Sequence, residues 1–244
     1  MSEAESAQRA VPRTLSILRQ LSRSPDLSVL EIAQQTGIPE STVYRILAET
    51  NLAGFTRRVG VGRYSAGPAS IPFAQRYRDH ALDQTAIAAQ LDRLVEQSGE
   101  LAAFLVPYGN EALCVETVET HRTLRCSFST GATQPMLYGA TATALLSRLP
   151  QAQRQQVYRH YALDDAAIQR IEGSCRQALT DGYATSVGAL DPGVWGVSAP
   201  VTDAAGALIG TVTIMAPESR TQGRTTRLID LVRTTSAELS GGQS

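Results

Sequence analysis

The chain has 244 residues, of which 43% are hydrophobic, and a formal net charge of −1, a composition that suits a small domain followed by a medium-sized one. No apolar run approaches the roughly 18–20 residues that cross a bilayer, and the start Met-Ser-Glu-Ala-Glu lacks the basic and apolar regions of a secretory signal. We therefore expect a cytoplasmic protein with no membrane partner. Cys114, Cys126 and Cys175 are too widely spaced for a zinc pattern or a disulfide framework, so we expect buried thiols.

Charge is distributed unevenly along the chain. Residues 1–78 hold ten arginines against six acids, a net charge of +4, whereas residues 79–244 hold twelve arginines against seventeen acids, a net charge of −5. A basic first third joined to an acidic remainder is typical of a nucleic-acid-binding module fused to a domain with another role.

The first elements in chain order predict a helix-turn-helix. Residues 1–8 resemble a frayed tail, and a first helix is predicted from about Val11 to Leu21, with Leu15, Leu18 and Leu21 facing the helices that follow. Ser28 and Glu31 have the spacing of a capping box, which begins a second helix, and Gly37 suits the left-handed conformation that ends it. A third helix then has one buried side, formed by Val43, Ile46, Leu47 and Thr50.

The other side of this third helix is polar and suits the major groove of DNA. It carries Ser41, Thr42, Tyr44 and Arg45. Hydroxyl groups suit phosphate oxygens, whereas Arg45 matches the two acceptors of a guanine edge, a contact that gives about 1–3 kcal/mol of base discrimination. A double-stranded DNA operator is therefore the expected partner.

Two short strands around a glycine-rich tip follow the third helix, from Phe55 to Val59 and from Arg63 to Ala66. We interpret them as a wing in which Arg57, Arg58 and Arg63 grip the phosphate backbone or lie in a minor groove. The alternative is a small helical domain whose arginines are simply solvated.

The rest of the chain alternates between predicted helices and strands. A connector helix is expected near residues 68–80 and a longer helix from Ala81 to Ser98. Strands are expected at Leu101–Pro107, Ala112–Val118, Thr123–Phe128, Tyr183–Val187, Val194–Val201 and Ala207–Met215, and helices at Gly139–Leu149, Gln151–Tyr158, Asp164–Gly182 and Thr221–Leu239. This order predicts an α+β protein, in which an antiparallel sheet is flanked by helices.

The combined motifs resemble those of the IclR family of bacterial transcription regulators over nearly the whole chain. The amino-terminal part contributes Arg13-Thr-Leu-Ser-Ile-Leu, Thr36-Gly-Ile-Pro-Glu-Ser-Thr-Val-Tyr-Arg-Ile-Leu and Gly62-Arg-Tyr-Ser-Ala-Gly-Pro. The second part contributes Pro135-Met-Leu-Tyr-Gly-Ala-Thr-Ala-Thr-Ala-Leu-Leu, Asp181-Gly-Tyr-Ala, Pro192-Gly-Val-Trp-Gly-Val-Ser-Ala-Pro-Val and Ala216-Pro-Glu-Ser-Arg220. Each motif alone is only moderately specific, whereas their joint order and spacing are strong signals.

The resemblance implies a winged helix-turn-helix domain at residues 9–67, a connector helix at 68–80 and a GAF-like effector-binding domain at 81–240. It further implies a homodimer or homotetramer on a palindromic operator, with a small-molecule effector bound in the second domain and no cofactor, metal or enzymatic activity. By the same resemblance, the effector cavity would be lined by Phe104, Met136, Leu137, Tyr138, Gly139, Ala140, Thr141, Ser186, Ala189, Trp195, Gly196, Ser198, Thr213 and Met215.

The chain departs from the family pattern at three of these positions. Ser186 and Ala189 stand where acids are common, and Gly196 stands where the family often has a cysteine or another polar residue. Because apolar and aromatic side chains would then dominate the cavity, we expect an uncharged or aromatic effector larger than a two- or three-carbon acid. Backbone N–H groups at residues 139–141 remain a possible carboxylate site.

Two other functions stay open at this point. One is a DNA-binding or interaction protein that no ligand controls. The other is an enzyme or metal site built from Cys114, His121 and Cys126 with Glu116 or Glu119, since a cysteine nucleophile needs a nearby histidine. The chain shows no nucleophile elbow, phosphate-binding loop or dinucleotide fingerprint that would strengthen the enzyme hypothesis.

Overall fold

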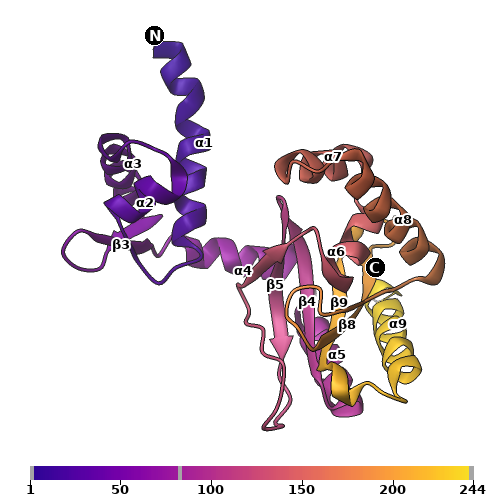
Figure 1. Ribbon diagram of the computed structural model, residues 1–244. Helices are drawn as coiled ribbons and strands as arrows, with labels where there is room; N and C mark the ends of the chain where they lie inside the picture. The colour runs from indigo at the N-terminus through magenta and orange to yellow at the C-terminus, as the bar shows by residue number, and fades with distance from the viewer. Residues whose placement is uncertain (1–2, 82–83, 242–244) are drawn as a thin grey trace. The chain divides into compact units, whose positions relative to one another are not determined.

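The computed structural model describes residues 3–81 and 84–241, and the chain divides into two compact units at residues 81 and 82 (Figure 1). The expected α+β fold class is confirmed, with a helix-turn-helix and a small sheet in the first unit and a larger antiparallel sheet with helices in the second.

The amino-terminal unit packs three helices and a three-stranded antiparallel sheet around one core. Its sheet has the strand order β1-β3-β2, so the two wing strands β2 and β3 are joined to a short strand before the second helix. The elements are α1 (Glu3–Leu21), β1 (Leu27–Ser28), α2 (Val29–Thr36), α3 (Glu40–Leu52), β2 (Thr56–Arg58), β3 (Arg63–Ala66) and α4 (Ser70–Ala81).

Helix α1 differs from its prediction at both its start and its buried face. It begins at Glu3 and continues through Pro12, so residues 3–8 are helical and not a frayed tail, while residues 1 and 2 lie outside the described residues. The segment is rich in alanine and glutamate, which are good helix formers, and the acids suit a helix amino terminus. The helix buries Ile17 and Leu21, whereas Leu15 is 59% exposed, so its expected packing role is wrong.

The carboxy-terminal unit is built on a six-stranded antiparallel sheet with the order β6-β5-β4-β9-β8-β7. The long central strands are β4 (Leu101–Tyr108), β9 (Leu208–Pro217) and β8 (Val194–Thr202), with β5 (Glu111–Val118), β6 (Thr133–Pro135) and β7 (Ala184–Val187) outside them. The helices are α5 (Gln84–Ser98), α6 (Gly139–Arg148), α7 (Gln151–His160), α8 (Asp165–Asp181) and α9 (Thr225–Gly241), with a short 3-10 helix at Glu218–Arg220. Residues 82 and 83 of the expected longer helix lie outside the described residues.

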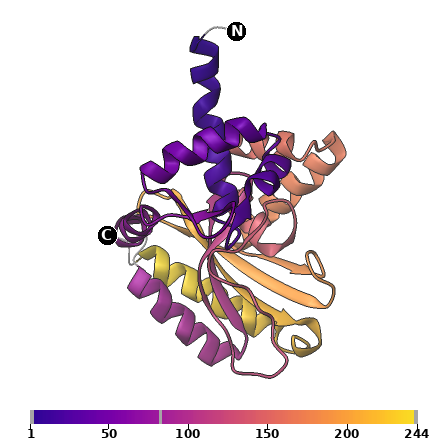
Figure 2. The ribbon, with the colours of Figure 1, turned by 90° about the vertical axis from the view of Figure 1, so that its left-hand side faces the viewer.

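Alternation along the strands gives this sheet two different buried faces. Phe104, Trp195 and Val212 point to the face covered by α5 and α9, which lie side by side in Figure 2. Leu105 and Cys114 belong to the opposite face, whose core includes residues of α6, α7 and α8. Because successive side chains of a strand point to opposite faces, strand register decides which core a residue joins.

The strand expected at Thr123–Phe128 is not formed, and the edge strand β6 begins ten residues later at Thr133. Side-chain bonds hold the expected segment in an irregular path. Arg125 donates to Glu119 at 2.8 Å, Ser127 also bonds Glu119, and Arg220 donates to the Leu124 carbonyl at 2.6 Å. Leu124 is also exposed, so the segment offers no continuous apolar face to the sheet.

A buried ion pair fixes the turn after β9 to the start of β4. The Arg220 guanidinium donates twice to the Glu100 carboxylate, at 2.9 and 2.5 Å, and an Arg224 nitrogen lies 3.6 Å from the same carboxylate. The Glu100 side chain is only 1% exposed, and these contacts raise the pKa of Arg220 through its hydrogen bonds to Glu100. A buried carboxylate needs such partners, which gives a structural reason for the arginine of the Ala216–Arg220 motif.

Candidate nucleic-acid interface and effector cavity

Helix α2 is positioned by the capping box that its sequence predicts. The Glu31 backbone N–H donates to the Ser28 hydroxyl at 3.2 Å, and the Ser28 N–H donates to the Glu31 carboxylate at 2.7 Å. The hydrogen bond from the Ser28 backbone N–H lowers the pKa of Glu31 most, and the hydrogen bond with the Ser28 side chain lowers it further. Gly37 ends the helix with φ of 68°, and its N–H donates to the Ala33 carbonyl at 2.9 Å. A tight turn to α3 follows.

Helix α3 buries one side and presents the other, as its periodicity predicts. Val43, Ile46, Leu47 and Thr50 are buried, whereas Ser41, Tyr44 and Arg45 are exposed and Thr42 is half-buried. Arg45 lies 3.5 Å from Glu49 one turn later, but both side chains are more than half exposed. Because exposed ion pairs of this spacing contribute only about 0.3–0.5 kcal/mol, this pair leaves Arg45 able to exchange Glu49 for a base.

The wing has two kinds of arginine. Arg57 and Arg58 lie on β2 and are exposed, and the Arg58 Nε donates to the Gly60 carbonyl at the tip, at 3.2 Å. Arg63 has a further role besides its predicted phosphate contact, because it forms an ion pair with Asp26 and lies 3.3 Å from Glu31. The hydrogen bond to Asp26 raises the pKa of Arg63. Pairing of Ser28 with Arg63 between β1 and β3 places this arginine beside both carboxylates, so Arg63 ties the wing to the start of α2.

A small cavity of about 40 Å³ lies at the amino-terminal end of α6 in the second unit. The strand residues around it include Gly196 and Thr213, which lie on the side of the sheet opposite α5 and α9. Among the residues expected from the resemblance, those that line the cavity are Gly139, Ala140, Thr141, Ser186, Ala189, Gly196, Thr213 and Met215. It is also lined by Gln134, Leu190, Asp191 and Val194, which the sequence analysis missed.

Hydrogen bonds organise the polar wall of this cavity. The Ala140 N–H at the start of α6 donates to the Ser186 hydroxyl at 3.0 Å. Behind it, the hydroxyls of Thr141, Ser198 and Thr213 form a buried triangle with separations of 3.2, 3.2 and 2.7 Å. Each hydroxyl can donate to the next, so this hydroxyl triangle satisfies its own donors and keeps free acceptor lone pairs.

Comparison with known proteins identifies the family. The model for the bacterial transcriptional regulator IclR C-terminal domain matches residues 80–241, and that for the IclR helix-turn-helix domain matches residues 10–51. The chain belongs to the IclR family. It is therefore a non-enzymatic, DNA-binding transcriptional regulator with a carboxy-terminal effector domain.

Individual relatives show how far the likeness extends. HTH-type transcriptional regulator KipR of Bacillus subtilis is 25% identical over 244 residues, which cover 95% of this chain and 96% of that protein. The crystal structure of the C-terminal domain of a Vibrio cholerae transcriptional regulator is 36% identical, with a TM-score of 0.63 over 67% of this chain and 99% of that one. An ICLR transcriptional regulator from Silicibacter sp. TM1040 is 19% identical, with a TM-score of 0.84 over 95% of each chain, and shares the fold.

Several residues that the IclR resemblance suggested do not line the α6 cavity. Phe104 and Trp195 belong to the core under α5 and α9, on the opposite face of the sheet, so their expected place in the cavity is wrong. Trp195 precedes Gly196 on β8, and neighbouring strand residues face opposite ways. Met136 is buried in the other core, Leu137 is half-buried, Tyr138 is 56% exposed and Ser198 lies behind the cavity in the hydroxyl triangle.

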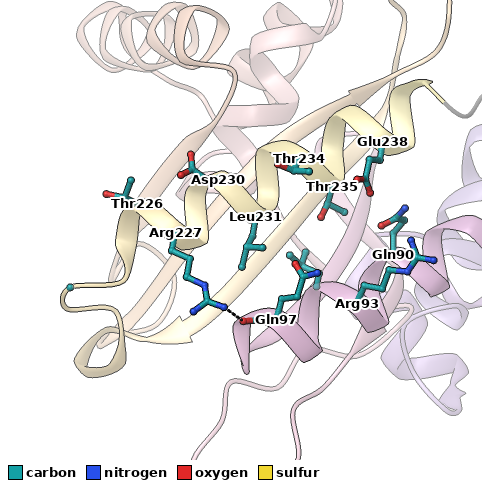
Figure 3. A pocket seen from close by; sticks show the side chains of 12 residues that line it. Gln90, Arg93, Gln97, Thr226, Arg227, Asp230, Leu231, Thr234, Thr235 and Glu238 are labelled. Atoms are coloured by element: carbon teal, nitrogen blue, oxygen red, sulfur yellow. Dashed lines mark hydrogen bonds between the residues drawn. The ribbon is translucent and has the colours of Figure 1, made fainter.

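A larger groove of about 580 Å³ runs between α5 and α9 (Figure 3). Its side chains are mostly polar, and the Arg227 guanidinium donates across it to the Gln97 carbonyl at 3.2 Å. Arg93 and Arg227 are balanced by Asp230 and Glu238, so the groove has no dominant charge. In the described part of the chain, two buried side-chain atoms lack a hydrogen-bond partner. Neither of them belongs to this groove.

The cysteine and histidine hypothesis has no structural support in this IclR-family chain. Burial raises the pKa of Cys114 to about 12, which keeps the thiol protonated and a poor nucleophile. His121 is exposed, and Glu119 is held by Arg125 and Ser127. Among the described residues, no group of three or more histidines, cysteines and acids is placed to hold a metal ion. The buried-thiol prediction fits Cys114 and Cys175, while Cys126 is only half-buried.

Over residues 3–81 and 84–241, the helices lack the combined length and apolar character that a bilayer span requires.

Proposed function

We propose that this regulator binds a specific duplex operator through α3 and the wing, and that a small metabolite in the α6 cavity changes its affinity for that operator. The exposed side of α3 is the observation that best supports DNA binding. Its Arg45 is presented for base contact, while Ser41, Thr42 and Tyr44 offer groups for phosphate oxygens. Arg57 and Arg58 on β2 supply sequence-independent contacts to the backbone.

The α6 cavity supports control by a small molecule. It combines a helix start and a serine hydroxyl in its wall with a buried hydroxyl triangle behind that wall. A ligand there changes operator affinity only if it binds more tightly to one arrangement of the DNA-binding units than to another. Couplings of this kind are typically about 1–3 kcal/mol, which corresponds to a change in operator affinity of roughly 5- to 150-fold.

We also propose that the chain acts as a homodimer or homotetramer. Val11 and Leu15 on α1 are 64% and 59% exposed, and Ile71 and Phe73 on α4 are 67% and 65% exposed. Large apolar side chains gathered on exposed helices are typical of surfaces that a partner covers. A twofold assembly would place two reading helices on successive half-sites of a palindrome.

Selection from a random duplex library followed by operator titration tests this proposal. The selected duplex should be palindromic, and a metabolite library that contains amides, hydroxy acids and aromatic acids should yield a compound that raises the melting temperature and changes operator affinity. A chain that enriches no sequence would contradict operator binding. If the chain enriches an operator but no compound of the metabolite library changes its affinity for that operator, metabolite control is contradicted.

Gly196→Ala locates the controlling site. An added Cβ would lie 3.5 Å from the Ser186 hydroxyl and 3.8 Å from the Ala140 Cβ, so it fits but takes space from the cavity. We expect this variant to lose most of the ligand-induced change in operator affinity. Gly173→Ala on α8 is the matched control, since its Cβ meets only the end of Arg176 at 3.9 Å and is distant from the cavity lining.

A further inference from the structure

One buried side chain of the α6 cavity has a polar atom without a partner. Gln134, on β6, is 4% exposed, and its Oε1 accepts no hydrogen bond in the structure. The backbone of Gln134 pairs with Ala112 on β5, so the strand itself does not require a polar side chain at this position. A buried amide oxygen without a donor is unfavourable, and Gln134 lines the cavity, so a ligand that brings a donor would relieve this cost.

The rest of the wall determines what kind of ligand fits. Ser186 already accepts the Ala140 N–H at the start of α6, so a donor that would otherwise attract a carboxylate is occupied. The hydroxyl triangle can use all three of its hydrogens internally. Among the described residues that line the cavity there is no arginine or histidine, and the one charged residue is Asp191. An anion here would lack a counter-charge, whereas a neutral donor would find several acceptors.

We infer that the effector is a small neutral molecule of the carboxamide or urea class, whose N–H group donates to the Gln134 Oε1. The Ser186 hydroxyl, which accepts from Ala140, keeps its own hydrogen to donate to the carbonyl of such a ligand. An amide offers a donor and an acceptor side by side, which matches this pair of protein groups.

The inference rests on the proposed function and revises the effector class expected from the sequence. The uncharged character is kept. The aromatic character is dropped, because Phe104 and Trp195 lie on the other face of the sheet. The volume of about 40 Å³ also suits a ligand of a few heavy atoms, since a single water molecule needs only about 10–15 Å³ on the same measure.

Calorimetry and ligand-observed NMR on the full-length protein can compare propionamide with propionate, which have nearly the same shape. Propionamide should bind about fivefold more tightly, the difference that one hydrogen bond of average strength provides. Gln134→Leu should abolish this preference. It should also raise the melting temperature of the ligand-free protein, because it removes the buried oxygen that lacks a partner while keeping similar volume.

Gln153→Leu on α7 is the matched control, because Gln153 is exposed and should leave both the amide preference and the melting temperature unchanged. Equal or tighter binding of propionate would overturn the inference. So would the absence of binding by both probes in the millimolar range, or an amide preference that survives Gln134→Leu. Operator titration separates this inference from the proposed function, because a carboxylate that binds the cavity and changes operator affinity would overturn only the amide assignment.

Discussion

The two units of this regulator place the polar groups of their proposed sites in opposite environments. The amino-terminal unit keeps them on the surface of α3 and β2, supported by an apolar core under one side of the helix. The carboxy-terminal unit buries them between α6 and the sheet, where each polar atom needs a partner. Surface groups are therefore accessible to a large partner such as DNA, whereas a ligand in the proposed cavity would have to complete the hydrogen bonds of its wall.

The ion pairs of the two units show the same contrast. Arg63 and its partners Asp26 and Glu31 have side chains that are 37–43% exposed, so water screens their attraction. In the second unit, Arg220 is 19% exposed and Glu100 is 1% exposed. Removing an arginine should therefore affect the two units very differently.

Arg220→Ala should produce the largest loss of stability. It leaves the Glu100 carboxylate buried with only the more distant Arg224, and breaking a buried pair in this way typically costs about 3–5 kcal/mol. Trp195, the single tryptophan, is buried in the core of this unit, so its fluorescence during urea unfolding reports the change. Arg63→Ala should cost much less stability, because water screens its exposed ion pairs. Similar losses for both variants would contradict the contrast between the units.

Arg45→Ala should reduce base discrimination at one operator position by about 1–3 kcal/mol. Arg57→Ala and Arg58→Ala should instead weaken binding to all sequences and flatten the salt dependence by roughly one unit, because they contact phosphates. Fluorescence anisotropy with the selected operator and single-base variants, at several salt concentrations, distinguishes the two effects. If Arg45→Ala keeps full selectivity, another residue reads the bases.

Thr213→Val should destabilise the second unit by about 1–3 kcal/mol, because it leaves two buried hydroxyls with one partner fewer. Adding Thr141→Val should cost less than the sum of the single changes, since both substitutions disrupt the same hydroxyl triangle. Urea unfolding of the two single variants and the double variant measures this coupling. Strict additivity would show that the three hydroxyls do not act together.

Acid should weaken the first unit through Glu31, an effect smaller than the others. Hydrogen bonds lower the pKa of Glu31 below its ordinary value of 4.5 in the folded state. Its contribution to stability is thus present above about pH 4.5 and is lost as the pH falls through the lower folded pKa. Far-UV circular dichroism, followed beside Trp195 fluorescence as a reporter of the other unit, should show this loss. Glu31→Gln should have a weaker acid dependence, and an unchanged profile would contradict the assignment.

The bounds and the buried side of α3 were predictable because their determinants are local. The capping box, the left-handed Gly37 and the buried residues of α3 all follow from spacings within one or two turns. The same local reasoning did not reveal the role of Arg63. Its partner Asp26 lies 37 residues away in sequence, and only the pairing of β1 with β3 brings them together.

The cavity was predictable only in part because strand register decides it. The helix start at residues 139–141 follows from the motif. The prediction that both Trp195 and Gly196 line the cavity was wrong, because neighbouring residues of a strand face opposite sides of the sheet. Gln134 was missed because the third strand was predicted at Thr123–Phe128, so residue 134 had no assigned face. A single polar residue between Thr133 and Pro135 gave no local signal of a ligand.

Gel retardation of the intergenic DNA upstream of this chain's own gene, at low ionic strength, tests the central claim most directly. The full-length protein should form a complex with this fragment at a lower concentration than with an unrelated fragment of equal length, and Arg45→Ala should reduce that difference. No complex with the upstream fragment, with or without amide and carboxylate ligands, would contradict the account.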